Sequence, residues 1–239
     1  MLGTLIYWLL YVGLHTLRLV GWFRWSVEGI ANLPPRKAGG MIVAMNHIHW
    51  MDIPVVGAML PFDYRLSWLA KSEIFQNPIA DRFFRTMNVI PIRRGKRDVA
   101  ALETAVEALR AGAVLLVYPE GHRSRTGVLQ QGRGGAVRMA MQAGVPIVPM
   151  AVVGTEHGLK GTLTRRPVLL RIGEPYMVAP TPDGKIPPDR MEQLTTDMML
   201  RIAALLPPER RGSYAQLPAP DGQPTVPMRA SAGGSLHPG

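Results

Sequence analysis

Short runs of apolar and β-branched residues alternate with stretches of helical periodicity between Val27 and Val178. This alternation is typical of an α/β domain, in which helices flank a central sheet. The runs predict five buried strands, over residues 41–45, 88–92, 113–118, 147–153 and 168–172. We therefore expect a single α/β domain built on a mixed, largely central β-sheet.

The segments between these runs carry signals for the ends of helices. Asp52-Ile53-Pro54 places a proline in a first helical turn, and Asp98 can cap a helix that stops at Gly112. Apolar positions at helical spacing predict two further helices, over 136–143 and 190–206.

The first 24 residues are apolar almost throughout. Their uninterrupted apolar stretch ends at Leu14, and His15 and Arg18 then interrupt it. About 13 residues of helix span about 20 Å, which is short of the roughly 30 Å hydrocarbon core of a bilayer. We expect residues 1–24 to form a membrane-associating helix, with a buried core helix and a single membrane span as alternatives. A cleaved signal peptide fits poorly, because no basic residue precedes the apolar run.

The composition changes after Leu206, since 7 of the last 33 residues are proline and 5 are glycine. Little apolar periodicity remains there, which favours disorder. The chain thus divides into the membrane-associating helix (1–24), the α/β domain (25–206) and a tail (207–239) that we expect to be disordered.

The chain of 239 residues carries 27 Lys and Arg against 17 Asp and Glu, a formal charge of +10. Residues 82–138 hold 11 of the basic and 4 of the acidic residues, and 22 of the 27 basic residues are arginine. Arginine pairs bidentately with phosphate, so this pattern predicts a phosphate-bearing partner. The absence of cysteine excludes a disulfide framework, a thiol nucleophile and cysteine-ligated zinc.

The most informative segment, Asn46 to Asp52, lies between the 41–45 strand and the helix after it. Open α/β sheets place ligands where a strand end feeds a helix start. There His47 and Asp52 can meet across the turn, so that the carboxylate orients the imidazole as a general base. His49 points to the other face of an extended segment and is a weaker candidate.

A metal site built on His47, His49 and Asp52 is an alternative reading of the same segment. It would need a further ligand from Glu120, His122 or His157. Nothing in the spacing requires such a site, and we expect no metal.

Basic and glycine residues also gather after two other strands. Glu120, Gly121 and Arg123 follow the 113–118 strand, and backbone N–H groups near the Glu120-Gly121 turn are candidate oxyanion donors. Arg133 lies among glycines before a helix, where an anion can bind. Arg93 and Arg94 follow the 88–92 strand, and Lys71 can add a further positive charge to a shared crevice.

Four blocks in this order resemble the motifs of the glycerolipid acyltransferase family, most closely its 1-acylglycerol-3-phosphate (lysophosphatidate) acyltransferases. Residues 46–52 resemble Asn-His-x4-Asp, and residues 88–94 resemble the second motif, a strand that ends in arginine. Residues 117–124 resemble Phe-Pro-Glu-Gly-Thr-Arg-Ser, and residues 145–149 resemble the Val-Pro-rich fourth motif. The resemblance covers residues 25–178.

This resemblance implies transfer of an acyl group from acyl-CoA or acyl carrier protein to the free hydroxyl of lysophosphatidate, with no cofactor and no covalent acyl-enzyme. It implies that His47 is the general base and that Asp52 orients it. It also implies that the acceptor phosphate is bound by the second and third motifs, through Arg94, Glu120, Gly121 and Arg123. Residues that could support the site are Asn46, Lys71, Arg93 and Arg133. We expect a protein at a membrane lipid bilayer, on the cytoplasmic face of the inner or plasma membrane.

Three positions depart from the family pattern. His122 replaces a threonine of the third motif, Asn88 replaces the glycine that opens the second, and Arg93 stands where an acidic residue is common. The extra positive charge favours an anionic acceptor or donor but equally fits a different head group. Acylation of another lysolipid, such as a lyso-ornithine lipid or lysophosphatidylglycerol, therefore remains an alternative.

Two other classes of function compete with this reading. The basic charge could serve a nonenzymatic nucleic-acid or anionic-membrane binding module, but the sequence contains no helix-turn-helix, zinc or RNP-type motif. We therefore expect no nucleic-acid partner. A lipid hydrolase would use the same base to activate water.

Overall fold

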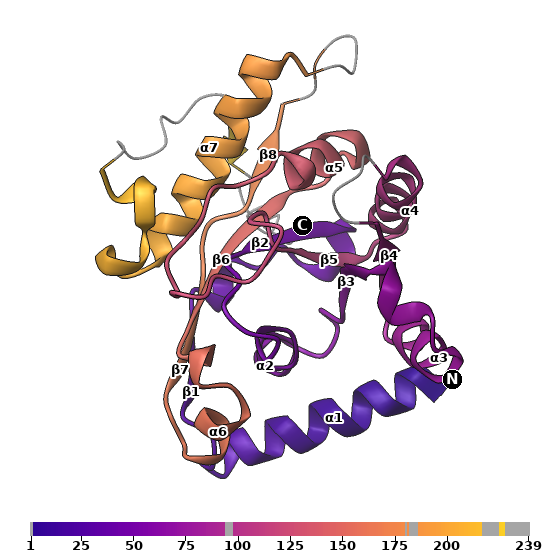
Figure 1. Cartoon of the computed structure of the whole chain (residues 1–239), viewed down its shortest axis with the longest axis vertical. Coiled ribbons are helices and arrows are strands. Elements are labelled where there is room, and N and C mark those ends of the chain that lie inside the picture. The colour runs from indigo at the N-terminus through magenta and orange to yellow at the C-terminus, as the bar shows by residue number, and fades with distance from the viewer. Residues whose placement is uncertain (1, 94–97, 180, 182–185, 217–224, 228–239) are drawn as a thin grey trace, which may run out of the picture.

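The computed structural model describes residues 2–93, 98–179, 181, 186–216 and 225–227. Strands of this part of the chain form one sheet in the order β1-β7-β6-β2-β5-β3-β4, and β8 pairs with β6 and β9 (Figure 1). The strands are β1 (Trp25–Glu28), β2 (Met41–Met45), β3 (Leu66–Lys71), β4 (Val89–Ile92), β5 (Val114–Val117), β6 (Ile147–Val153), β7 (Val168–Ile172), β8 (Tyr176–Val178) and β9 (Thr225–Pro227). Neighbours on the main path are parallel except β6 and β7, so the predicted mixed α/β sheet is confirmed.

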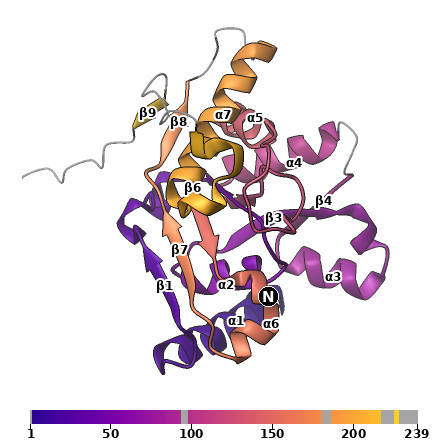
Figure 2. The same ribbon diagram turned by 60° about the vertical axis from the view of Figure 1, so that its left-hand side comes forward.

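Helices cover both faces of the sheet, as Figures 1 and 2 show. The helices are α1 (Leu2–Leu19), α2 (Asp52–Met59), α3 (Pro78–Thr86), α4 (Val99–Arg110), α5 (Gly135–Ala143), α6 (Gly158–Leu163) and α7 (Pro188–Leu205). On β2, Ile42 and Ala44 pack into the core under α4, α5 and α7, whereas Met41, Val43 and Met45 pack on the α2 side. This alternation explains why the whole strand is buried and reads as one apolar run.

The local signals for strands and helices were mostly read correctly. Asp98 caps α4 by accepting a hydrogen bond from the backbone N–H of Ala101, and α2 begins at Asp52. Asn88 has a φ of 61°, a left-handed conformation that glycine adopts freely and asparagine tolerates better than most residues. This conformation explains why Asn88 can stand at a motif position usually held by glycine. The sequence analysis missed β1, β3, β8, β9, α3 and α6.

The N-terminal helix α1 lies across α2 and α3 along one edge of the molecule. Leu14 packs against the core on the α2 side, and Trp8 packs its ring on Phe62 with centroids 4.1 Å apart. Its other face is exposed, with Leu9 66% and Leu19 73% accessible to solvent. The alternative of a buried core helix is therefore wrong. In the part of the chain that is described, no helix combines the length and apolar character needed to cross a bilayer.

The chain remains folded beyond the predicted boundary at Leu206. Residues 208–216 form two short 3-10 helices, Pro208–Arg210 and Gly212–Gln216. Tyr214 is buried, and its hydroxyl accepts a hydrogen bond from the backbone N–H of Gly132. Arg210 adds an ion pair with Glu156 at 2.6 Å, and its carbonyl accepts the N–H of Leu129. One buried aromatic side chain and polar contacts hold this segment, so apolar periodicity could not reveal it.

Candidate active site

His47 and Asp52 meet in the turn between β2 and α2, as the sequence predicted. His47 Nδ1 lies 2.8 Å from Asp52 Oδ2, and the carboxylate is fully buried. An imidazole that donates its Nδ1–H to a carboxylate holds its lone pair on Nε2. His47 can therefore accept a proton at Nε2, and Asp52 is placed to stabilise the imidazolium that forms.

The turn itself holds Asp52 in place. Asp52 Oδ2 also accepts hydrogen bonds from the backbone N–H groups of Ile48, at 2.8 Å, and His49, at 3.0 Å. Asp52 is the first residue of α2, where the helix dipole favours a negative charge. Oδ1 is buried and has no hydrogen-bond partner in the described part of the chain. The three bonds to one oxygen fix the carboxylate that orients His47.

Asn46 fixes the start of this turn to the neighbouring strand. Its side-chain amide donates to the carbonyl of Val152 at 2.9 Å, and its carbonyl accepts from the N–H of Val152 at 2.8 Å. Asn46 is buried, and both ends of its amide are bonded to β6, so it joins the turn to that strand.

Tyr118, which the sequence analysis did not select, packs directly on His47. The two rings are stacked, with centroids 3.8 Å apart and planes 14° apart. The Tyr118 hydroxyl is buried without a partner among the described residues. Burial, together with the nearby charge of Asp52, raises the pKa of this phenol well above its ordinary value, so it stays neutral. The register Ala44↔Val117 places Tyr118 beside the end of β2, and this pairing was the signal that could have identified it.

Glu120 does not occupy the position expected of a phosphate ligand. Its side chain is 1% exposed, Oε1 accepts the N–H of His47 at 2.7 Å, and Oε2 accepts the N–H of Gln130 at 2.9 Å. Burial raises the pKa of this carboxyl to about 7, although both hydrogen bonds favour the charged form. Glu120 therefore joins two loops at the site, and a negatively charged group here would repel a phosphate. Both carboxylate oxygens accept backbone N–H groups, and binding of the acceptor by Glu120 stays a prediction.

Gly121 and Arg133 form one packed unit beside this carboxylate. Gly121 has a φ of 77°, and a Cβ atom there would lie 3.2 Å from Arg133 Nε. The N–H of Gly121 donates to the carbonyl of Tyr118 at 3.0 Å, so this group is already used and is a poor oxyanion donor. Glycine is required here by the backbone conformation and by the close approach of the Arg133 guanidinium.

The predicted basic residues separate into two groups. Lys71, at the end of β3, and Arg123 both line the cavity that contains His47. Arg93 is instead engaged with Asp98, which accepts its backbone N–H at 2.8 Å and lies 3.7 Å from its Nε. The backbone N–H groups of Arg93 and Ala101 hold the pKa of Asp98 below its ordinary value. Arg94 lies outside the described residues.

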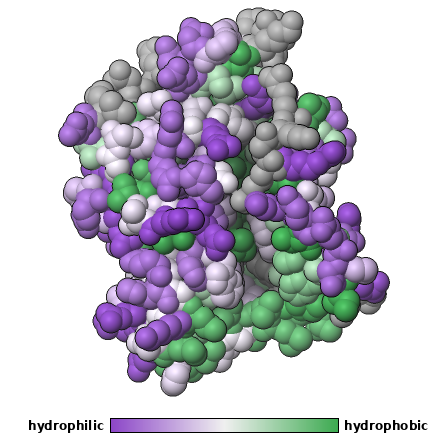
Figure 3. All heavy atoms as spheres, viewed as in Figure 1, coloured by the Kyte–Doolittle hydropathy of each residue, from purple (hydrophilic) through white to green (hydrophobic). Residues whose placement is uncertain are grey.

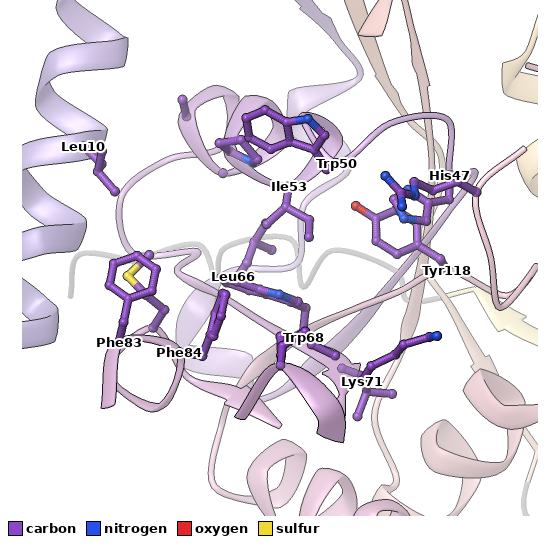
Figure 4. A pocket seen from close by; sticks show the side chains of 18 of the residues that line it. Leu10, His47, Trp50, Ile53, Leu66, Trp68, Lys71, Phe83, Phe84 and Tyr118 are labelled. Atoms are coloured by element: carbon purple, nitrogen blue, oxygen red, sulfur yellow. The ribbon is translucent and has the colours of Figure 1, made fainter. Parts of the chain in front are cut away.

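A cavity of about 670 Å³ extends from His47 between α1, α2, α3 and β3 (Figure 4). Its polar residues, His47, Tyr118, Lys71 and Arg123, include the predicted base and two cations. The walls elsewhere are almost wholly apolar, and Phe83 and Phe84 lie at the far side from His47 in Figure 4. Further wall residues are Leu10, Tyr11, Leu14, Trp50, Ile53, Leu66, Trp68, Ile74 and Met87. Such a cavity suits a long apolar chain whose reactive end reaches the imidazole.

The residues of the alternative metal site have other partners. His49 Nδ1 accepts the backbone N–H of Met51 at 3.2 Å, and Asp52 Oδ2 is used by the turn and His47. Within the described ranges, no group of three or more His, Cys, Asp or Glu side chains is arranged to hold a metal ion.

Comparisons with known proteins agree with this geometry. The chain is 30% identical over 145 residues to the 1-acyl-sn-glycerol-3-phosphate acyltransferase of Bacillus subtilis, covering 60% of this chain and 69% of that protein. It is 32% identical over 152 residues to the lyso-ornithine lipid O-acyltransferase of Pseudomonas aeruginosa, covering 59% and 56% of the two chains. It spans 44% of the chloroplastic acyltransferase LPAT1 of Arabidopsis thaliana, at 30% identity over 159 residues and 64% of this chain.

A solved structure and a family model extend the comparison. The fold is similar to the crystal structure of the 1-acyl-sn-glycerophosphate (LPA) acyltransferase PlsC from Thermotoga maritima, with a TM-score of 0.59 and 25% identity over 82% of this chain and 78% of that one. The family model described as Acyltransferase matches residues 24–153, which contain His47, Asp52 and Glu120. The chain belongs to the Acyltransferase family.

Proposed function

We propose that this protein transfers a fatty acyl group from a thioester, acyl-CoA or acyl carrier protein, to the free hydroxyl of lysophosphatidate. One observation carries the proposal: the apolar cavity of about 670 Å³ reaches the imidazole of His47, which Asp52 orients at 2.8 Å. An acyl chain bound in this cavity places the carbonyl of its thioester beside the imidazole of His47.

In the proposed reaction, His47 Nε2 takes the proton of the acceptor hydroxyl as that oxygen attacks the thioester carbonyl carbon. The C–S bond then breaks, the acyl group stays on the acceptor oxygen, and the imidazolium returns its proton to the departing thiolate. Asp52 stabilises the imidazolium between these steps. The thioester is already activated, so binding both substrates in line supplies much of the rate.

The hydroxyl of Ser124 does not act as a nucleophile in this scheme. Ser124 donates its hydroxyl hydrogen to the carbonyl of Val128 at 2.7 Å, and its N–H donates to the carbonyl of His47. The side chain is buried in the loop that it stabilises. Direct transfer through His47 requires no acyl-enzyme.

The acceptor phosphate is proposed to bind Lys71 and Arg123, which lie on the cavity wall near His47. The likeness to the Pseudomonas aeruginosa protein favours a lyso-ornithine lipid as the second candidate acceptor. Two cations favour the phosphate-bearing acceptor, because arginine and lysine bind phosphate through charge-assisted hydrogen bonds.

The exposed apolar face of α1 is proposed to bind the bilayer that contains the lysolipid. Figure 3 shows apolar side chains gathered along the lower edge of the molecule, over α1. The same helix contributes Leu10, Tyr11 and Leu14 to the cavity, so an acyl chain could pass from lipid into the cavity along it. Because the proposed donor is acyl-CoA or acyl carrier protein, we propose that the enzyme acts at the cytoplasmic face.

Thiol release by the purified protein tests this function directly. With acyl-CoA or acyl carrier protein as donor and lysophosphatidate as acceptor, the protein should release the free thiol and form phosphatidate, and H47A should abolish both. Thiol release that does not depend on an acceptor would instead identify a hydrolase. A panel of lysolipids separates the two acceptor candidates: R123A should lower kcat/KM more for phosphate-bearing than for neutral acceptors, and equal losses would refute the phosphate assignment.

A further inference from the structure

A second exposed apolar patch lies beside the end of α1, formed by a segment more than 130 residues later in the sequence. In α6, Leu159 and Leu163 are 53% and 60% exposed, whereas Gly161 and Thr162 between them are buried. The two leucines are four residues apart, so they share the outer face of the helix. Leu159 and Leu163 thus form an exposed apolar pair on this six-residue helix.

Two hydrogen bonds join the chain that follows α6 to the chain that follows α1. The guanidinium of Arg165 donates to the carbonyl of Gly21 at 2.7 Å, and the N–H of Val168 donates to the carbonyl of Arg24 at 3.0 Å. Figure 1 shows α6 beside this end of α1. Val20 and Trp22, in the chain that follows α1, are 71% and 48% exposed. We name the exposed side chains of residues 19–24 and 158–167 the α1–α6 surface.

The charge on this surface has one sign. Residues 19–24 and 158–167 contain four basic residues, Arg24, Lys160, Arg165 and Arg166, and no acidic residue. All four are exposed. Elsewhere the surface arginines often have acidic partners, as Arg171 has Glu28 at 2.7 Å and Arg210 has Glu156 at 2.6 Å. Apolar side chains surrounded by uncompensated basic residues match the chemistry of an anionic lipid surface, where acyl chains lie next to phosphate.

We propose that the α1–α6 surface is a second bilayer contact, in which α6 inserts Leu159 and Leu163 while Lys160, Arg165 and Arg166 bind anionic head groups. It rests on the proposed function, which places α1 at a membrane. A protein that binds a bilayer through α1 alone can rotate about the axis of that helix. Contacts from both α1 and α6 prevent this rotation. The second contact thus fixes the orientation in which the cavity beside α1 faces lipid, and two membrane signals bind more stably than one.

Vesicle binding by the full chain tests the apolar part. Sedimentation with vesicles of equal parts phosphatidylglycerol and phosphatidylcholine should show roughly tenfold weaker binding or worse for the double variant L159Q/L163Q. Glutamine has a helix propensity close to that of leucine, so α6 should persist. The matched control is V99Q, on α4, where Val99 is 52% exposed on a different part of the molecule; it should bind as the wild type does.

The charge test uses K160Q/R166Q, which leaves the Arg165 bond to Gly21 intact. Each basic residue near an anionic surface contributes about fivefold to binding, so this variant should bind anionic vesicles at least tenfold more weakly. It should bind pure phosphatidylcholine vesicles as the wild type does. Wild-type binding of both double variants to anionic vesicles would overturn the proposal. So would concentration-dependent dimerisation of the wild type without lipid that L159Q/L163Q abolishes, because the surface would then join two copies of the chain.

Activity measurements separate this proposal from the proposed function. Both double variants should retain wild-type turnover of a short-chain lysophosphatidate dispersed as monomers and lose activity only on vesicle-borne acceptor. Loss of turnover on the monomeric acceptor by L159Q/L163Q, with an unchanged unfolding temperature, would overturn the membrane role. Absence of turnover by the wild type itself would count against the proposed function alone, since vesicle binding is measured independently.

Discussion

The imidazole of His47 lies flat against the phenol ring of Tyr118, with centroids 3.8 Å apart and planes inclined by 14°. Asp52 fixes the same imidazole through Nδ1. Stacking restricts the tilt of the ring, and the hydrogen bond restricts its rotation about its own normal. Two contacts from different elements thus define the direction in which Nε2 points, which is the requirement for proton transfer in a fixed geometry.

The stacking contact predicts different outcomes for two substitutions of Tyr118. Y118F keeps the ring and removes a buried hydroxyl that has no partner among the described residues, so turnover should stay within a few fold of wild type and stability should not fall. Y118L removes the flat surface and should lower kcat about tenfold. Steady-state kinetics and thermal unfolding measure both effects. Y176F is the control, because the Tyr176 hydroxyl is also buried without a partner among the described residues but lies outside the cavity lining. A large loss of kcat in Y118F would show that the Tyr118 hydroxyl itself takes part in the reaction.

The buried charge of Asp52 beside His47 predicts a severe effect of D52N. Asparagine carries no negative charge, so even with its amide oxygen in the place of Oδ2 the imidazolium loses the stabilisation that the carboxylate gives. We expect kcat to fall by about 10² to 10⁴ while the protein still binds its acyl donor. Kinetics paired with a donor-binding measurement checks this. Turnover of D52N within a few fold of wild type would rule out Asp52 as the orienting group.

The raised pKa of Glu120 predicts a pH dependence of stability. The carboxyl has an ordinary pKa of 4.5 and a pKa of about 7 in the folded protein, so between these values the folded state binds more protons than the unfolded state. The contribution of Glu120 to the free energy of unfolding is therefore fully present below pH 4.5 and is lost as pH rises through about 7. Other groups contribute to the measured curve as well, so a variant comparison is needed.

Urea unfolding of wild type and E120Q at several pH values isolates this contribution. The difference in the free energy of unfolding, wild type minus E120Q, should decrease as pH rises from 4.5 to 7. E120Q should also turn over more slowly at every pH, because its NH₂ group must face the backbone N–H of His47 or Gln130. A difference that does not change with pH would mean that Glu120 titrates in its ordinary range.

The cavity wall predicts control over the length of the acyl chain. Gly57, on α2, lines the cavity, and a Cβ atom there would meet only Leu66 Cδ1, at 3.9 Å. G57L therefore has room to project into the space that the acyl chain would fill. It should shift preference toward donors shorter by roughly two to four carbons, since each excluded CH₂ loses about 0.8 kcal/mol of burial. Competition between donors of different length, read by mass spectrometry, measures the shift. The control A100L, at an exposed position of α4, should keep the wild-type profile.

Local signals determined a large part of the fold. A buried parallel strand must be apolar at every position, so the runs at 41–45 and 147–153 were recognisable without any partner strand. A cap such as Asp98 bonds to a backbone three residues away and is equally local. The sequence did not predict β3, because polar residues interrupt its short apolar run. Its strand conformation depends on pairing with β4 and β5.

Within the site, the spacing of residues 46–52 is enough to predict the His47–Asp52 pair, because one turn between a strand and a helix brings these side chains together. The other features of the site depend on contacts between distant segments. Tyr118 stacks on His47 because β5 pairs with β2. Glu120 links two loops because its carboxylate accepts the backbone N–H groups of His47 and Gln130. The cavity forms because α1, α2, α3 and β3 enclose it. Hydrogen bonds within a turn are encoded by spacing, whereas an enclosed volume and the partner of a buried carboxylate depend on residues that only folding brings within reach.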